Sequence, residues 1–157
     1  MTAPAITLRA VTPDNFDAVI GLRVADEQSN FVAPNLYSLA ETYVEPTYRP
    51  FAIYVGDDPV GFTMYGRDER TGEWWIMRLM IAHAHQAQGY GRVAMEALIA
   101  LMIAEHGMSE IVTSFEPEND VAAKLYRRLG FVDTGEIVDD ELVMRLDVSA
   151  VTAARRN

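Results

Sequence analysis

The chain has 157 residues and no cysteine, which predicts one domain with its own core and excludes a disulfide framework, a thiolate metal site and a cysteine nucleophile. Its formal net charge of -10 argues against nucleic acid as a partner and fits either a cationic small-molecule substrate or an acidic surface that maintains solubility. We find no basic leader and no apolar run of membrane-spanning length, so we expect a cytoplasmic protein with no membrane partner.

Hydrophobic periodicity and turn residues divide the chain into helices and strands without repeats or linkers. Thr12 and Pro13 predict the start of the first helix, and Ser38 followed by Glu41 is a capping-box signal for the second. The expected elements are strand 6–10, helix 12–28, a short helix from 38 that ends before Pro46, strands 51–55, 60–65 and 74–81, helix 92–106, strand 110–115, helix 119–129, and strands 131–137 and 141–146.

This order, β-α-α-β-β-β-α-β-α-β-β, predicts a single α/β domain with a mixed, mostly antiparallel sheet. Asn119 is expected to cap its helix, and Gly107 and Gly130 are expected to end the two helices before them. We expect the domain to span residues 1–147 and a flexible tail to follow over residues 148–157.

The segment Gln86-Ala87-Gln88-Gly89-Tyr90-Gly91, called the glycine segment below, lies directly before the amphipathic run 92–106. Glycines permit positive φ and close backbone approach, and the free N–H groups of a first helical turn attract an anion. Arg92 can add a charge-assisted contact. The segment therefore predicts a pyrophosphate site. A dinucleotide fingerprint over 89–94 and a purely structural glycine turn are the alternatives, and the seven mostly polar residues 82–88 argue against the former.

Two motifs some thirty residues apart resemble those of the GNAT N-acetyltransferase superfamily. Residues 86–91 match its Q/R-x-x-G-x-G/A acyl-CoA loop, and residues 119–131 match its N-x-x-A-x-x-L-Y-x-x-x-G-F helix and strand. The N-terminal half resembles the bacterial spermine/spermidine acetyltransferases over segments 10–15, 28–33, 50–54 and 60–66. The chain departs from the family pattern at three positions: Ala87 replaces a common glycine, Ala82 replaces a common aspartate, and Met77 replaces an acid found in some polyamine enzymes.

The resemblance implies acetyl-CoA as cosubstrate, no metal, and direct acetyl transfer to a primary amine of a small cationic acceptor, a polyamine or diamine such as spermine or spermidine. It implies a sheet that splays at the acyl-CoA site, and relatives that dimerise make a homodimer an expectation. The alternatives are transfer to an aminoglycoside, an amino acid or a protein amine, and a non-catalytic acyl-CoA-binding module. The expected CoA-binding residues are Leu79, Met80, Ile81, Gln86, Ala87, Gln88, Gly89, Tyr90, Gly91, Arg92, Asn119 and Tyr126.

Tyr126 is the expected catalytic acid, since a phenol can protonate the departing thiolate; the alternative is a half-buried aromatic of an amphipathic helix. The acceptor amine is protonated at neutral pH and must lose a proton before it attacks. Glu27 is the first candidate for the base or the amine anchor, Glu41 is the second, and Glu116 is a third that acts through water. A solvated helix face is the alternative for such acids.

Two further positions have competing interpretations. Asn119 either hydrogen-bonds the pantetheine arm of CoA or only caps its helix, and both roles are compatible. His83 and His85 flank the glycine segment, but two histidines without carboxylate partners are weak evidence for zinc, so we expect surface loop residues.

Overall fold

The computed structural model describes residues 5–149 and residue 151. The order of strands and α-helices over these residues is the predicted one. The strands are β1 (Ile6–Ala10), β2 (Arg49–Val55), β3 (Asp58–Arg67), β4 (Trp74–Ile81), β5 (Glu110–Phe115), β6 (Val132–Val138) and β7 (Glu141–Asp147). The helices are α1 (Phe16–Gly21), α2 (Asn35–Val44), α3 (Tyr90–His106) and α4 (Asp120–Arg128), with short 3-10 helices η1 (Asp26–Gln28) and η2 (His83–His85).

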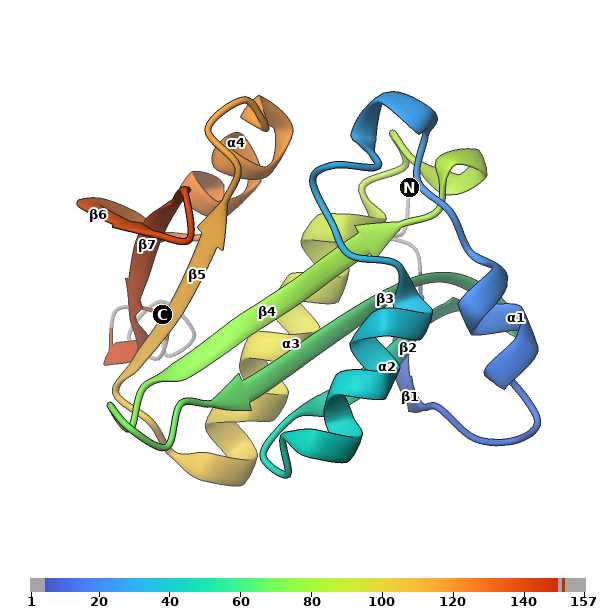
Figure 1. The fold of residues 1–157 in the computed structure, drawn as a ribbon, viewed down its shortest axis with the longest axis horizontal. Coiled ribbons are helices and arrows are strands. Elements are labelled where there is room, and N and C mark those ends of the chain that lie inside the picture. The colour runs from blue at the N-terminus through green and yellow to red at the C-terminus, as the bar shows by residue number, and fades with distance from the viewer. Residues whose placement is uncertain (1–4, 150, 152–157) are drawn as a thin grey trace.

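One mixed sheet contains all these strands in the order β1-β2-β3-β4-β5-β7-β6. The pairing of β4 with β5 is parallel and extends only from Trp74 to Ile76 on β4, whereas the other pairings are antiparallel. Beyond Ile76 the two strands diverge toward their carboxyl ends (Figure 1). The Thr113 hydroxyl donates to the Ile76 carbonyl oxygen, 3.0 Å away, where the pairing ends. The predicted single α/β domain with a splayed mixed sheet is therefore confirmed.

Helices cover both faces of the sheet, with α1 and α2 in front and α3 behind in the view of Figure 1. Val19 of α1 packs with Phe62 and Met64 of β3 on the first face. The other face holds the larger core cluster, in which α3 residues such as Leu98 pack with residues of α4, β5 and β7. Burial of these apolar faces is what holds the layers together.

A β-bulge interrupts β4 beside the point where the strands diverge. The register changes from Met64↔Arg78 to Tyr65↔Ile76, which leaves Met77 as the extra residue on β4. Bulges bend a strand and redirect the side chains near them. One of the three departures from the family pattern, Met77, therefore lies at a place where the backbone itself is irregular.

The first helix is shorter than expected. It begins at Phe16 and ends at Gly21, and η1 forms separately over Asp26–Gln28. Thr12 does not cap it, because the Asn15 side chain accepts the Thr12 N–H at 2.8 Å and donates to the Ala10 carbonyl at 3.0 Å, which holds the chain in a turn before the helix. The prediction of a helix from Thr12 to about Gln28 was wrong at both ends.

The second helix starts earlier than the capping-box signal predicts, at Asn35 directly after Pro34. Ser38 is fully buried inside the helix, and its hydroxyl accepts a hydrogen bond from Arg78 Nε at 3.2 Å. Glu41 pairs with the same arginine. Ser38 and Glu41 therefore serve a tertiary contact with β4 in place of the predicted cap.

The predicted ends of the later elements are confirmed. Gly107 ends α3 at φ 64°, in the left-handed region, and the Asn119 side chain accepts the Ala122 N–H at 3.2 Å, as an N-cap should. Asp139 and Asp140 both have positive φ in the turn between β6 and β7. Within the expected tail, Val148 is 5% exposed and packs in the core, whereas 150 and 152–157 lie outside the described residues.

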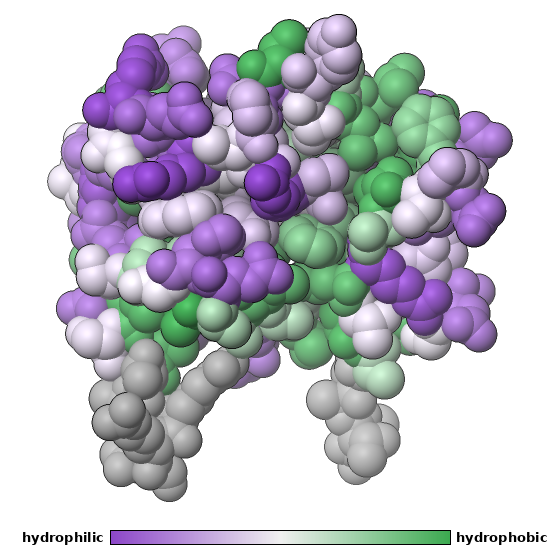
Figure 2. All heavy atoms as spheres, turned by 90° about the horizontal axis from the view of Figure 1, so that it is seen from below, coloured by the Kyte–Doolittle hydropathy of each residue, from purple (hydrophilic) through white to green (hydrophobic). Residues whose placement is uncertain are grey.

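On the face seen from below in Figure 2, hydrophilic residues gather at the upper left, and apolar residues gather to the right of the middle and at the lower left. Most of the exposed large apolar residues lie on α2, where Tyr43 is 93% exposed, and on the edge strand β6, where Val132 is 66% exposed. None of the helices over the described residues combines the length and the hydrophobicity that a membrane span requires.

Candidate active site

A cavity of about 750 Å³ opens where β4 and β5 diverge. Its walls come from β4, the segment 85–91, the end of β5, α4 and the stretch 28–34. A volume of this order is typical of sites that bind small molecules. The expected site residues that line it are Leu79, Met80, Ile81, Gln86, Ala87, Gly89, Tyr90, Gly91, Glu116, Asn119 and Tyr126.

The β4 wall offers backbone polar groups on the side that faces the cavity. Residues 78–81 pair with β3 on one edge, while the register with β5 stops at Ile76. Backbone N–H and C=O groups on an open strand edge need partners, and an extended amide-containing ligand can supply them. Leu79, Met80 and Ile81 therefore lie where a pantetheine arm can be held.

The glycine segment forms the second wall with a backbone suited to an anion. Ala87 has φ 61° and Gly89 has φ 80°, so two left-handed residues precede α3. The Val93 N–H donates to the Gly89 carbonyl oxygen at 3.4 Å. The N–H groups of Tyr90, Gly91 and Arg92 precede this first helical bond and, together with the helix dipole, suit a pyrophosphate.

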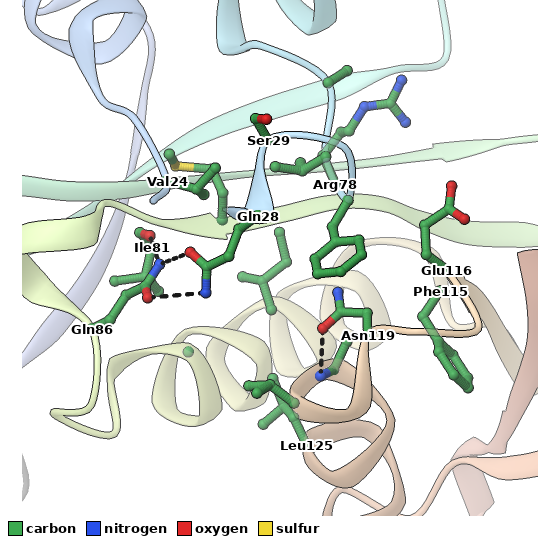
Figure 3. A pocket seen from close by; sticks show the side chains of 18 of the residues that line it. Val24, Gln28, Ser29, Arg78, Ile81, Gln86, Phe115, Glu116, Asn119 and Leu125 are labelled. Atoms are coloured by element: carbon green, nitrogen blue, oxygen red, sulfur yellow. Dashed lines mark hydrogen bonds between the residues drawn. The ribbon is translucent and has the colours of Figure 1, made fainter. Parts of the chain in front are cut away.

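Gln86 has a structural partner that sequence reasoning missed. Its amide and that of Gln28 form two reciprocal hydrogen bonds, and Gln86 Nε2 also donates to the Ile81 carbonyl oxygen at 2.9 Å (Figure 3). Gln28 Oε1 in turn accepts the Ala25 N–H at 3.1 Å. The Gln86 side chain is thus committed to protein contacts that join the glycine segment to η1, although it lines the cavity.

Arg92 and Gln88 lie outside the set of described residues that line the cavity. Arg92 Nε is 3.1 Å from Glu96 Oε1 on the next turn of α3, and both side chains are largely exposed. Such i,i+4 pairs on a surface are weak, so this pair leaves the arginine able to exchange partners.

Tyr126 enters the cavity from α4, which Asn119 caps. The residue is 7% exposed, and its ring packs between Phe115 and Phe131 at centroid distances of 6.4 and 5.7 Å. Burial raises the pKa of Tyr126 to about 12. The phenol therefore keeps its proton at neutral pH, as a general acid must.

The acids expected at the acceptor side are separated by the structure. Glu27 is exposed and lies outside the described residues that line the cavity. Glu41 Oε1 is 2.7 Å from Arg78 Nη2, with both side chains about one-fifth exposed, so its charge is already matched. Glu116 follows β5 and does line the cavity, as Figure 3 shows.

Sequence reasoning missed Arg78 and Glu141, which both line the cavity. Arg78 follows the bulge on β4, and Glu141 accepts a hydrogen bond from Ser114 Oγ at 3.2 Å. Neither belongs to a local motif, since their position depends on strand pairing. The one sequence signal for Glu141 was the predicted turn at Asp139 and Asp140. The residue that follows a hairpin turn begins the returning strand, which lies beside the strand before the turn.

His85 lines the cavity, whereas His83 is exposed on η2. Over the part of the chain that the structure describes, there is no group of three or more His, Cys, Asp or Glu side chains that could hold a metal ion. The cavity offers groups that suit a thioester cosubstrate of the CoA type and an amine. Open backbone groups, a helix N-terminus and a phenol can donate hydrogen bonds, and carboxylates can accept them from an ammonium group.

Comparison with known proteins identifies the family that the two sequence motifs resemble. The profile of the acetyltransferase (GNAT) family matches residues 14–131. The spermine/spermidine N(1)-acetyltransferase of Bacillus subtilis (strain 168) is 31% identical over 139 residues, which cover 85% of this chain and 91% of that protein. The probable spermine N(1)-acetyltransferase of Bacillus subtilis subsp. natto (strain BEST195) matches to the same extent.

Solved structures show the same fold at lower identity. Aminoglycoside acetyltransferase AAC(6')-Ib in complex with coenzyme A superposes with a TM-score of 0.80 at 18% identity, covering 96% of this chain and 99% of that one. Spermidine N-acetyltransferase from Vibrio cholerae in complex with CoA and spermine has a TM-score of 0.71 at 19% identity, covering 89% and 92%. The chain therefore belongs to the GNAT acetyltransferase family and is an acetyl-CoA-dependent N-acetyltransferase.

Proposed function

We propose that the acceptor is a small cationic amine of the polyamine or diamine class, such as spermine or spermidine. The observation that carries this proposal is the pair of carboxylates, Glu116 and Glu141, in the cavity wall that also contains Tyr126. Two carboxylates in one cavity attract an ammonium group strongly when water is partly excluded. The curated relative at 31% identity, named as a spermine/spermidine acetyltransferase, supports the same class.

The donor end of the cavity is proposed to take acetyl-CoA along β4 and the glycine segment. Leu79, Met80 and Ile81 would pair with the pantetheine arm, and the N–H groups of residues 87–92 would hold the pyrophosphate. Asn119 already caps α4 with its side-chain oxygen, which leaves its NH₂ group free to donate to a pantetheine carbonyl. The bound thioester would then lie beside Tyr126.

The proposed chemistry is direct transfer. The deprotonated amine attacks the thioester carbonyl, the carbon–sulfur bond breaks, and the Tyr126 phenol donates its proton to the departing sulfur. General acid assistance of this kind contributes about 10²–10⁴ to the rate. Because the chain has no cysteine, a covalent cysteinyl intermediate is not available.

A second acceptor class is an aminoglycoside, an amine that carries many hydroxyl groups. The observation in its favour is Arg78 in the cavity wall, whose guanidinium donates to the buried Ser38 hydroxyl and to the Glu41 carboxylate. A guanidinium in this wall repels a second ammonium but can hydrogen-bond a hydroxyl or carbonyl oxygen. Amino acids and protein amines are the remaining acceptors to test.

Thiol release from acetyl-CoA, followed with a chromogenic thiol reagent, tests the proposal without background from the protein, which has no cysteine. The panel contains spermine, spermidine, putrescine, an aminoglycoside, free lysine and a lysine peptide. We expect the highest kcat/KM with spermine or spermidine. A preference of tenfold or more for another amine would contradict the acceptor class and keep the family chemistry.

Two further parts of the proposal concern the cell and the assembly. We place the enzyme in the cytoplasm, which the lack of cysteine allows, and fractionation of cells that express it tests this. Dimerisation through the last strands stays a prediction, which analytical ultracentrifugation tests. Exposed apolar side chains on β6, Val132, Ile137 and Val138, are compatible with such a surface.

A further inference from the structure

Strand pairing places Glu141 at the open end of the splayed sheet. Glu141 is the first residue of β7, which pairs antiparallel with β5 so that Leu142 lies opposite Phe115. The preceding turn has positive φ at both Asp139, 50°, and Asp140, 65°, as a type I′ hairpin requires. A tight turn and a paired strand hold the Glu141 backbone on both sides, so its side chain starts from a fixed position.

The side chain is half-buried and faces the cavity. Its Oε1 accepts a hydrogen bond from Ser114 Oγ on β5 at 3.2 Å. Burial raises the pKa of Glu141, and the charges of Glu116 and Asp139 raise it further, whereas Ser114 and Arg78 act in the opposite direction. A carboxylate with a raised pKa is a better proton acceptor than an ordinary one.

The neighbours of Glu141 are those of a reacting centre. Tyr126 on α4 lines the same cavity, and the negative charge of Glu141 contributes to the raised pKa of its phenol. Glu116 directly follows β5 and lines the cavity, two residues after the Ser114 whose hydroxyl donates to Glu141. An amine held here meets two carboxylates, so that one can take its proton while the other stays charged. The Tyr126 phenol would lie near the thioester of bound acetyl-CoA.

We propose that Glu141 is the proton acceptor for the attacking amine and that Glu116 holds the ammonium beside it, an inference that rests on the proposed function. The Glu141 carboxylate takes one proton from the R–NH₃⁺ group, which frees the nitrogen lone pair for attack on the thioester carbonyl. Sulfur leaves with the electron pair of the carbon–sulfur bond and takes the Tyr126 proton. The second nitrogen proton restores the phenol, and Glu141 returns its proton to water. The sum is one amide, one thiol and one released proton.

The other acids cannot take this role as the structure stands. Glu27 is exposed outside the cavity wall, and Glu41 is matched by Arg78 at 2.7 Å. The ion pair engages the Glu41 carboxylate, which also lies outside the described residues that line the cavity. Glu141 combines a cavity position with a raised proton affinity.

The test compares Glu141→Gln with Glu116→Gln and with Glu118→Gln, an exposed control just beyond β5. Steady-state kcat and KM are measured from pH 5 to pH 10 with the best amine of the panel. We expect Glu141→Gln to lower kcat at pH 7 by about 10²–10⁴, with the rate then rising toward the amine's own pKa near ~10, as a missing base requires. Glu116→Gln should chiefly raise the KM of the amine, and Glu118→Gln should match the wild type.

CoA affinity by calorimetry shows whether each variant is folded, and Glu141→Gln should keep it within twofold. Ser114→Ala is an independent variant: losing the hydrogen bond that lowers the Glu141 pKa should move the acid limb of kcat/KM to higher pH. The inference is overturned if Glu141→Gln stays within threefold of the wild type, or if it loses rate with an unchanged pH profile. A wild-type enzyme that binds CoA but turns over no amine of the panel overturns the proposed function and, with it, the inference.

Discussion

Gln28 and Gln86, 58 positions apart in the chain, exchange two hydrogen bonds through their side-chain amides, at 3.2 and 2.9 Å. This contact connects η1 to the glycine segment on which CoA binding is proposed to depend. Gln86 also donates to the Ile81 carbonyl at the end of β4, so one side chain joins three segments. The position of the glycine segment is therefore set from outside its own motif.

Gln86→Met removes these hydrogen bonds while keeping the length of the side chain. The Gln28 amide is left in a half-buried place without its partner, so we expect the unfolding free energy to fall by about 1–3 kcal/mol. The KM for acetyl-CoA should rise more than kcat falls. Urea unfolding of Gln28→Met, Gln86→Met and the double variant gives the coupling energy, and a coupling near zero would contradict a joint role.

Ala87→Gly should stabilise the protein. Ala87 has φ 61°, a conformation that costs a non-glycine residue about 1–2 kcal/mol, part of which is offset by the greater freedom of glycine in the unfolded chain. We expect a net gain of up to about 1 kcal/mol by thermal or urea unfolding. Ala84→Gly, at an exposed position of η2 where φ is negative, is the control and should be neutral or destabilising.

Gly91→Asp should abolish measurable CoA binding, since a carboxylate at the start of α3 repels a pyrophosphate and cancels the helix dipole. We expect a loss of at least ~100-fold in affinity by calorimetry. Gly91→Ala separates charge from folding, because a Cβ there meets Ile81 and Leu125 at an ordinary 3.8 Å. The alanine variant should fold with unchanged or higher stability, and equal CoA affinities for both variants would remove Gly91 from the site.

Tyr126→Phe should lower kcat by about 10²–10⁴ and leave CoA affinity within a fewfold of the wild type. The ring keeps its packing against Phe115 and Phe131, so a folded protein is expected. Because burial raises the pKa of Tyr126 to about 12, its ionisation should give no basic limb in kcat below about pH 10. Tyr43→Phe, at a position 93% exposed, serves as the control in the same assays.

Glu141→Gln should raise the thermal midpoint while it lowers activity. The folded state holds the Glu141 proton more tightly than the unfolded chain, so the ionised carboxylate costs stability at pH values above its raised pKa. We expect a gain of about 1–3 °C at pH 7. The gain should vanish below the ordinary pKa of a glutamate, where Glu141 is protonated in both states, and a gain of equal size at pH 3.5 would point to packing.

Several features of this protein follow from the sequence because their causes are local. The strand Trp74–Ile81, the caps at Asn119 and Gly107, and the turn at Asp139 and Asp140 all depend on neighbours within a few residues. The glycine segment and the 119–131 motif likewise point to the family, because each is a short stretch of consecutive residues that can be read without the fold.

Only the tertiary structure decided which acids meet in the cavity. Glu27 and Glu41 were expected at the acceptor side, yet one is exposed and the other pairs with Arg78. Glu141 reaches the cavity because β7 pairs with β5 over residues that lie 30 positions or so apart in the chain. Such pairings depend on burial of whole sheet faces, which no local pattern encodes, so charges distant in sequence become neighbours only when the chain has folded.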